Sequence, residues 1–189
     1  MTQGAYRTPL GEVPIDESCA VALRTRCSFL AQDDSAQMGE HAIEVLLPFL
    51  QRRAPDDLSI VPLITSSEDV EECHRVAVAL AQVVRMQEEP VLLIASTDLS
   101  HYEPLERAAV QDHSLIEAIR SLETDRLLNL MRDQGIRMCG VGAVICVLEA
   151  AKALGAQGGT LAAYGTSADA GGDPHSTIGY AGMVIHSYG

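Results

Sequence analysis

The chain has 189 residues, of which 47% are hydrophobic, and this length favours one domain with a sizeable core. Thirteen Lys and Arg against 26 Asp and Glu give a formal net charge of -13, which repels phosphate backbones and anionic lipid surfaces. No apolar run approaches the roughly 20 residues that span a bilayer, and residues 1–4 do not resemble a signal peptide. We therefore expect a single cytoplasmic domain over residues 1–189, without nucleic acid or membrane partners.

Hydrophobic periodicity divides the first half of the chain into alternating segments. Helices are predicted over residues 16–30 and 40–53, and Pro48 should bend or interrupt the second helix. The short apolar run at residues 58–64 is typical of a strand. Residues 67–69 then read Ser-Glu-Asp, which indicates the start of another helix.

The second half continues the alternation and predicts the fold class. Residues 90–95 form an apolar run that is typical of a buried strand, and residues 165–176 are rich in Gly, Ser and Asp and should form a loop. Further helices are predicted over residues 103–121, 124–132 and 140–154, and the last strands over residues 160–164 and 177–186. This order predicts an α/β protein with a central sheet covered by helices.

Polar and ionisable residues crowd the exit of the apolar run at residues 90–95, where open α/β sheets bind ligands. An imidazole at His101 can exchange protons near neutral pH, and Asp98 or Ser100 can orient the ring. The alternative is that Asp98 and Ser100 cap the next helix and that His101 is an exposed loop residue. Spacing alone does not separate these two interpretations.

Five cysteines without any Cys-x-x-Cys spacing argue against a disulfide framework or a zinc knuckle, and most should be buried small hydrophobic residues. Cys139 differs because it immediately precedes an apolar helix, whose free amides favour a thiolate, and Arg137 lies nearby. A thiolate there can bind iron, copper or zinc, or act as a nucleophile. The alternative for Cys139 is again a packed hydrophobic residue.

Two further segments contain candidate residues that line a site. Glu40 and His41 lie at the start of a predicted helix, one turn before Glu44, and can line a site or bind a cation. For Glu40 the sequence alone favours a solvated first turn that complements the helix dipole. Tyr180 belongs to the glycine-containing entry of the last predicted strand and is a further candidate for site lining.

Several motifs together resemble the MEMO family, whose bacterial and archaeal members are called protein B of the AmmeMemoRadiSam system. Each motif is weak by itself, but six in the same order make the resemblance specific. The motifs are residues 6–11 (YRTPLG), 40–50 (EHAIEVLLPFL), 96–102 (STDLSHY), 138–140 (MCG), 164–167 (YGTS) and 179–181 (GYA).

The resemblance implies a fold of the class III extradiol dioxygenase (LigB-like) type, with a mostly parallel sheet. It implies that Cys139 is a ligand of iron or copper and that His101 occupies an acid/base position. The family's other two metal ligands are histidines in Pro-His-Ala-Gly and Gly-Pro-Ser-His stretches, and neither stretch occurs here. We therefore expect an N-terminally truncated fold in which metal binding needs water, another chain or a recruited residue such as His41.

The resemblance also suggests a function and partners. The leading hypothesis is metal-dependent, dioxygenase-like redox chemistry on an unidentified small molecule, which the truncation can abolish. The alternative is a non-catalytic module whose cleft binds a peptide or protein. Partners implied by the family are an AMMECR-like protein, a radical-SAM enzyme and a separate N-terminal segment. A third hypothesis is an unstable fragment without a function of its own.

Overall fold

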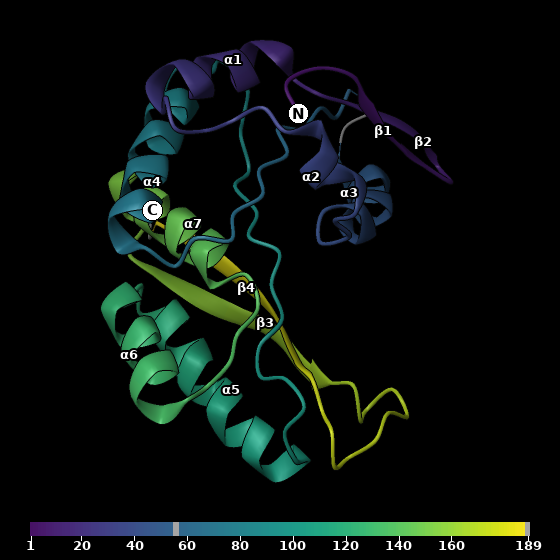
Figure 1. Ribbon diagram of the computed structural model, residues 1–189, viewed down its shortest axis with the longest axis vertical. Coiled ribbons are helices and arrows are strands. Elements are labelled where there is room, and N and C mark those ends of the chain that lie inside the picture. Colours follow the sequence, from purple (N-terminus) through teal and green to yellow (C-terminus); the bar gives the residue numbers. More distant parts are fainter. Residues whose placement is uncertain (55–56, 188–189) are drawn as a thin grey trace. The chain divides into compact units, whose positions relative to one another are not determined.

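The computed structural model describes residues 1–54 and 57–187 and divides the chain into two compact units (Figure 1). Unit 1 comprises Met1–Ser66 and Gln82–Val91, and unit 2 comprises Ser67–Ala81 and Leu92–Gly189. Each unit has its own secondary structure, so the units are treated one after the other. The single domain over residues 1–189 stays a prediction.

Unit 1 begins with an antiparallel hairpin of β1 (Ala5–Thr8) and β2 (Gly11–Pro14), which the sequence analysis did not predict. Helix α1 (Glu17–Arg26) follows, and it begins where the Asp16 carboxylate accepts a hydrogen bond from the Cys19 amide at 2.9 Å. A side-chain oxygen in this position satisfies one of the unpaired amides of the first turn. The helix predicted over residues 16–30 is therefore confirmed, with an earlier end.

The helix predicted over residues 40–53 is wrong in its first part. The short helix α2 (Asp34–Met38) precedes this region, residues 40–43 are not helical, and a single 3-10 turn, η1 (Glu44–Leu46), leads into α3 (Leu47–Arg53). Pro48 lies in the first turn of α3, where its missing N–H has no partner to lose and its fixed φ suits a helix. Pro48 thus starts a helix rather than bending one.

Neither of the apolar runs predicted as strands, residues 58–64 and 90–95, is a strand in the described part of the chain. In the first run only Ile60 is paired, through an isolated parallel bridge with Ile15. The backbone groups of Leu92–Ala95 have no hydrogen-bond partner among the described residues. Apolar, β-branched composition favours an extended chain, but a strand also requires a neighbouring backbone along its length, and neither run has one among the described residues.

Unit 2 contains most of α4 and five complete elements that agree with the predicted order. Asp69 accepts a hydrogen bond from the Glu72 amide at 3.0 Å, which confirms the predicted helix start at residues 67–69. The elements are α4 (Val70–Val84), α5 (Leu105–Arg120), α6 (Thr124–Gln134), α7 (Val141–Ala153), β3 (Gly158–Thr166) and β4 (Gly179–His186). The glycine-rich loop predicted over residues 165–176 joins β3 to β4.

The core of unit 2 forms between its helices and an antiparallel β3–β4 hairpin. Helix α5 contacts both strands, and α7 contacts α6 and β4 (Figure 1). Leu115, Leu127, Ile145 and Leu148 are fully or almost fully buried. Because α7 is built from small and apolar residues, neighbouring elements pack on several of its sides.

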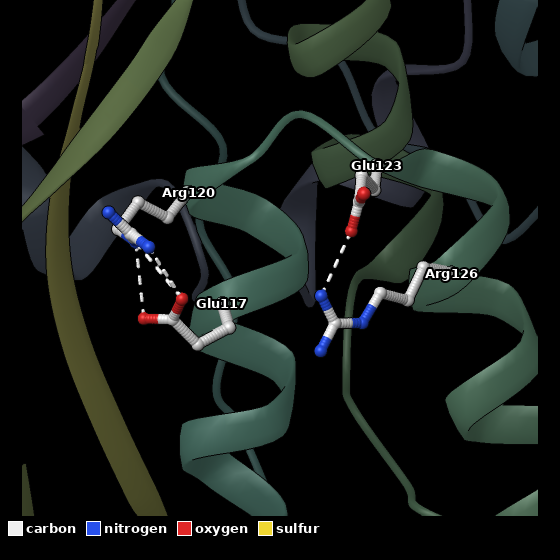
Figure 2. Close-up of polar contacts among 4 residues, drawn as sticks. All are labelled: Glu117, Arg120, Glu123 and Arg126. Carbon is white, nitrogen blue, oxygen red and sulfur yellow. Dashed lines mark hydrogen bonds and ion pairs between the residues drawn. The ribbon is translucent and has the colours of Figure 1, made fainter.

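The turn between α5 and α6 shows that burial rather than ion pairing positions these helices. Figure 2 shows two ion pairs at the turn, Arg120–Glu117 at 2.7 Å and Arg126–Glu123 at 3.0 Å, and all four side chains are about half exposed. Such pairs contribute little because water and salt screen them. Leu122, by contrast, is only 7% exposed and adopts a left-handed backbone (φ 57°), so its burial in the core stabilises an unfavourable conformation.

The strand pairing bears on the predicted sheet type. Both ladders in the described residues are two-stranded and antiparallel, and parallel pairing there is limited to the bridge between Ile15 and Ile60. A mostly parallel sheet of the LigB-like type stays a prediction. Within residues 1–54 and 57–187, no helix is long and apolar enough to cross a membrane.

Candidate functional site

The segment that carries the predicted cluster, residues 96–102, lies in unit 2 and is attached to the β3–β4 hairpin. The Leu99 amide donates to the Gly179 carbonyl at 2.9 Å, and the Gly179 amide donates to the Ser100 carbonyl at 3.0 Å. Glu103 and Thr177 continue this pairing through an antiparallel bridge. The chain after Leu99 is therefore held beside the entry of β4.

A buried carboxylate provides a second attachment for the same segment. Asp112 on α5 is 0% exposed, and its Oδ1 accepts the Ser100 amide at 2.8 Å while its Oδ2 accepts the Tyr164 hydroxyl at 2.8 Å. A Cβ at Gly179 would lie 1.9 Å from Oδ2, so the carboxylate fills the space that any larger residue would need. Asp112 thus joins α5, β3, β4 and the cluster segment at one point.

The predicted His101–Asp98 pair is formed. Nε2 of His101 lies 3.5 Å from Oδ2 of Asp98, and the two side chains are 20% and 42% exposed. The N-cap of α5 is Pro104 and no side chain caps this helix, so the alternative that Asp98 and Ser100 cap it is excluded. A largely covered imidazole beside a carboxylate can be held in one orientation and still exchange protons with a ligand or water.

Tyr102 lies beside this pair and has an unusual backbone conformation. Its backbone is left-handed (φ 57°), its side chain is 73% exposed, and its ring centroid lies 5.8 Å from that of His101. A non-glycine residue rarely adopts this conformation without being held there by its surroundings. The hydrogen bonds of Ser100 and Glu103 on either side of His101 and Tyr102 provide that restraint.

Cys139 lies at the same end of unit 2. The Thr97 hydroxyl donates a hydrogen bond to the Cys139 carbonyl, and Thr97 directly precedes Asp98. Gly140 starts α7 with a left-handed backbone (φ 66°), and a Cβ there would meet the Ser96 carbonyl at 3.0 Å. Cys139 is exposed, so its interpretation as a packed hydrophobic residue is wrong, whereas Cys27, Cys73 and Cys146 are buried as predicted.

The other predicted site residues are placed differently. Glu40 and His41 belong to unit 1, where Glu40 accepts the Ala42 amide at 2.8 Å and the His41 side chain is 85% exposed. The helical first turn that the sequence favoured for Glu40 is not formed, because residues 40–43 are not helical, and the Glu40 side chain is only 33% exposed. Tyr180 follows Gly179 in β4, next to the cluster segment, and is 43% exposed.

The donor set does not by itself fit a metal ion. Within the described ranges, no group of three or more His, Cys, Asp and Glu side chains is arranged to hold one. A closed iron or copper site needs more donors than Cys139 and His101 supply. Metal binding by these residues therefore needs donors from elsewhere.

Asp112 was not predicted from the sequence, and Gly179 was named there only as part of the motif at residues 179–181, although a signal for Asp112 existed. Helix α5 buries positions at helical spacing, and Asp112 falls within this buried stripe beside Gln111, Leu115 and Ile116. An acidic residue at such a position must find hydrogen-bond partners, because a buried carboxylate is otherwise strongly unfavourable. The identity of those partners is visible only in the folded chain.

The comparisons with known proteins all indicate the same family. A family model for Memo-like protein matches residues 1–184. The MEMO1 family protein of Methanopyrus kandleri is 39% identical over 185 residues, which cover 98% of this chain and 65% of that protein. MEMO1 family proteins of Methanococcus maripaludis and Methanocaldococcus jannaschii are each 37% identical, with 97% and 96% of this chain covered and 66% and 64% of their own lengths.

The matches leave part of each relative uncovered. The chain spans about two thirds of the length of these curated relatives, while nearly all of its own residues are matched. The matched residues include both the His101–Asp98 pair and Cys139. This chain therefore belongs to the Memo-like protein family.

Proposed function

We propose that this chain contributes the proton-transfer pair and the thiol donor of a site that performs dioxygenase-like redox chemistry on a small molecule. The supporting observation is the hydrogen bond from Thr97 to the Cys139 carbonyl, which brings the exposed thiol to the end of unit 2 that carries Asp98 and His101. Family membership agrees with this site but does not specify a reaction.

In this proposal His101 gives or takes a proton at the ligand, and Asp98 orients its ring through the contact at 3.5 Å. Ser100 keeps the backbone of this segment in place through its bond to Asp112. Cys139 immediately precedes Gly140, the N-cap of α7, and its sulfur is the soft donor that iron or copper accepts. The remaining metal donors come from outside the described residues, so no step through the metal is derived.

Metal analysis after anaerobic purification tests the proposal. The chain is measured alone and mixed with the part of the Methanopyrus kandleri relative that this chain does not match, with iron or copper supplied. We expect metal only in the mixture, and Cys139→Ser should lower metal affinity by at least about tenfold. Cys19→Ser, which alters a half-buried thiol in unit 1, is the matched control.

His101→Gln separates proton transfer from metal binding. Because His101 is proposed to move a proton, its variant should keep the bound metal and lose turnover in an oxygen-consumption screen of candidate small molecules. If a complex forms but binds no metal, or if Cys139→Ser binds metal as well as wild type, the redox proposal is overturned.

A non-catalytic binding module is the second candidate. The observation that favours it is that the described residues contain no three-donor group. For this candidate, Cys139→Ser and His101→Gln should alter binding of a partner without any change in metal content or oxygen consumption.

A further inference from the structure

Two buried cysteines lie in contact inside the core of unit 2. Cys73 on α4 and Cys146 on α7 are 1% and 5% exposed and belong to the same cluster of packed residues. The Cys146 thiol is hydrogen-bonded to the Cys73 sulfur, and the Cys73 thiol lies 3.8 Å from the Ser67 carbonyl. The two thiols are far apart along the chain, so only the fold brings their sulfurs together. Neither residue has a role in the proposed function.

The folded chain protects this pair of thiols. Burial raises the pKa of the Cys73 thiol, and the hydrogen bond from Cys146 opposes this effect only in part. The thiolate is the form that attacks oxidants, so both sulfurs react slowly while they are buried. Oxidation of the pair therefore requires a local opening that brings one of the two sulfurs to solvent.

The start of α4 is the part of this core that opens most easily. Residues 68–72 are exposed, and Cys73 is the first buried residue of the helix. The preceding segment, residues 61–69, has no regular secondary structure, and the first turn is held by the Asp69 carboxylate, which accepts the Glu72 amide at 3.0 Å. Helix ends open far more readily than cores, so the loss of one turn presents the Cys73 sulfur to solvent.

We propose that Cys73 and Cys146 are a redox couple that a peroxide converts into a disulfide between α4 and α7. When the first turn of α4 opens, the Cys73 thiolate attacks one peroxide oxygen, the O–O bond breaks, and the leaving oxygen departs with a proton. When the turn closes, the Cys146 sulfur displaces the oxygen of the Cys73 sulfenic acid as water, and the S–S bond forms. The two sulfurs give up two electrons in total, and the peroxide accepts them.

The disulfide acts as a lock on the opening that produced it. Once the sulfurs are joined, the first turn of α4 is tied to α7, and the link closes a long loop in the unfolded chain. A thiol reductant reverses the bond by thiol–disulfide exchange. The thermal midpoint of the oxidised chain should exceed that of the reduced chain by at least about 5 °C.

Peptide mapping after peroxide treatment tests the bond. The metal-free full chain is treated with hydrogen peroxide, blocked with iodoacetamide in denaturant and cut with trypsin without reduction. Trypsin cuts after Lys and Arg, so Cys73 lies on residues 54–75, whereas Cys139 and Cys146 share residues 138–152. The Cys139→Ser variant therefore identifies which thiol is joined. We expect the two peptides to be linked in wild type and in Cys139→Ser, and to separate on reduction.

Cys146→Ala in the Cys139→Ser background is the matched control. This chain should not form the link, and its Cys73 should be oxidised further to sulfinic acid, because the thiol that captures the sulfenic acid is missing. Cys27→Ala removes a buried thiol of unit 1 and should leave the link unchanged. A folded Cys139→Ser chain whose Cys73 is still alkylated after peroxide, or becomes sulfinic acid, would overturn the proposal.

Substitutions of Asp69 test the route through the opened turn. Asp69→Ala removes the cap of α4, whereas Asp69→Asn keeps a capping side chain. Both variants remove the charge that contributes to the raised pKa of Cys73, so they differ only in the cap. The disulfide should form about fivefold faster in Asp69→Ala than in Asp69→Asn. Equal rates would overturn the opening route, and a thermal midpoint that oxidation leaves unchanged would overturn the lock.

Discussion

The two halves of the stretch from Leu92 to Glu103 differ in how their backbones are satisfied. The second half is tied to Gly179, Asp112 and Thr177 by hydrogen bonds, and it carries the His101–Asp98 pair. The first half, Leu92–Ala95, has equally suitable composition for a strand but no backbone partner among the described residues. Local sequence therefore does not decide which half becomes fixed; the availability of a partner does.

The comparison also bears on the proposed proton-transfer pair, which lies in the second half. Catalytic side chains must be held close to one geometry, and rigid backbone on either side supplies this restraint. Asp112 holds Ser100, the residue immediately before His101, from inside the core. We expect stability to depend strongly on this attachment.

Asp112→Ala should have the largest effect. The substitution leaves the Ser100 amide and the Tyr164 hydroxyl without their acceptor, and each such group contributes a loss of roughly 1–3 kcal/mol. We expect the free energy of unfolding to fall by about 3 kcal/mol in urea titrations followed by circular dichroism. Asp133→Ala, at an exposed position of α6, is the control, and equal stability of the two variants would contradict the role of Asp112.

Gly179→Ala tests the close contact between β4 and the Asp112 carboxylate. Its Cβ would lie 1.9 Å from Asp112 Oδ2, so either the carboxylate or β4 must move. Overpacking of this kind lowers the free energy of unfolding by about 2 kcal/mol. Gly182→Ala, in the same strand with no atom within 4 Å of the added Cβ, should have a much smaller effect. Similar urea midpoints for the two variants would argue against a tight contact.

Gly140→Ala tests how closely the Cys139 end of α7 approaches the cluster segment. Gly140 and Gly135 have nearly the same left-handed backbone, with φ of 66° and 65°, but only at Gly140 would a Cβ meet another atom, the Ser96 carbonyl at 3.0 Å. Both alanine variants carry the conformational strain, so Gly140→Ala should be less stable than Gly135→Ala by about 0.5–1 kcal/mol. Thermal unfolding of the two variants measures this difference.

The effect of Tyr164→Phe should depend on pH. Burial, together with the hydrogen bond to Asp112, raises the pKa of Tyr164 above its usual value near 10. The native state therefore resists ionisation of a group that ionises in the unfolded chain, and this contribution is present below about pH 10 and lost as pH rises further. The stability of wild type should fall more steeply than that of Tyr164→Phe above about pH 10 in urea titrations, and parallel curves would contradict this assignment.

Sequence reasoning identified the elements whose signals are local. The helices of unit 2, the β3–β4 strands and the loop between them follow from periodicity, capping residues and glycine content. The start of α3 at Pro48 was missed because a proline can either interrupt a helix or begin one. The hairpin of β1 and β2 was missed because its strands have only four residues each.

The candidate site was predictable in its residues but not in its attachments. Asp98, His101 and Cys139 stood out through residue type and position, and the structure brings the segments that carry them together. Asp112 did not stand out, since its partners are 12 and 52 residues away along the chain. Glu40 and His41 belong to unit 1, and this division of the chain is visible only in the folded structure.

The sequence by itself determined the helices of unit 2, where the ionisable cluster lies and which family the chain resembles, because these depend on residue type and spacing along the chain. Only the tertiary structure decided that Asp112 and Gly179 hold the cluster, that Cys139 adjoins Thr97, and that Leu92–Ala95 has no partner in the described residues. The physical reason is that hydrogen-bond satisfaction of a buried carboxylate or an extended backbone depends on groups distant in sequence, which come together only when the chain folds.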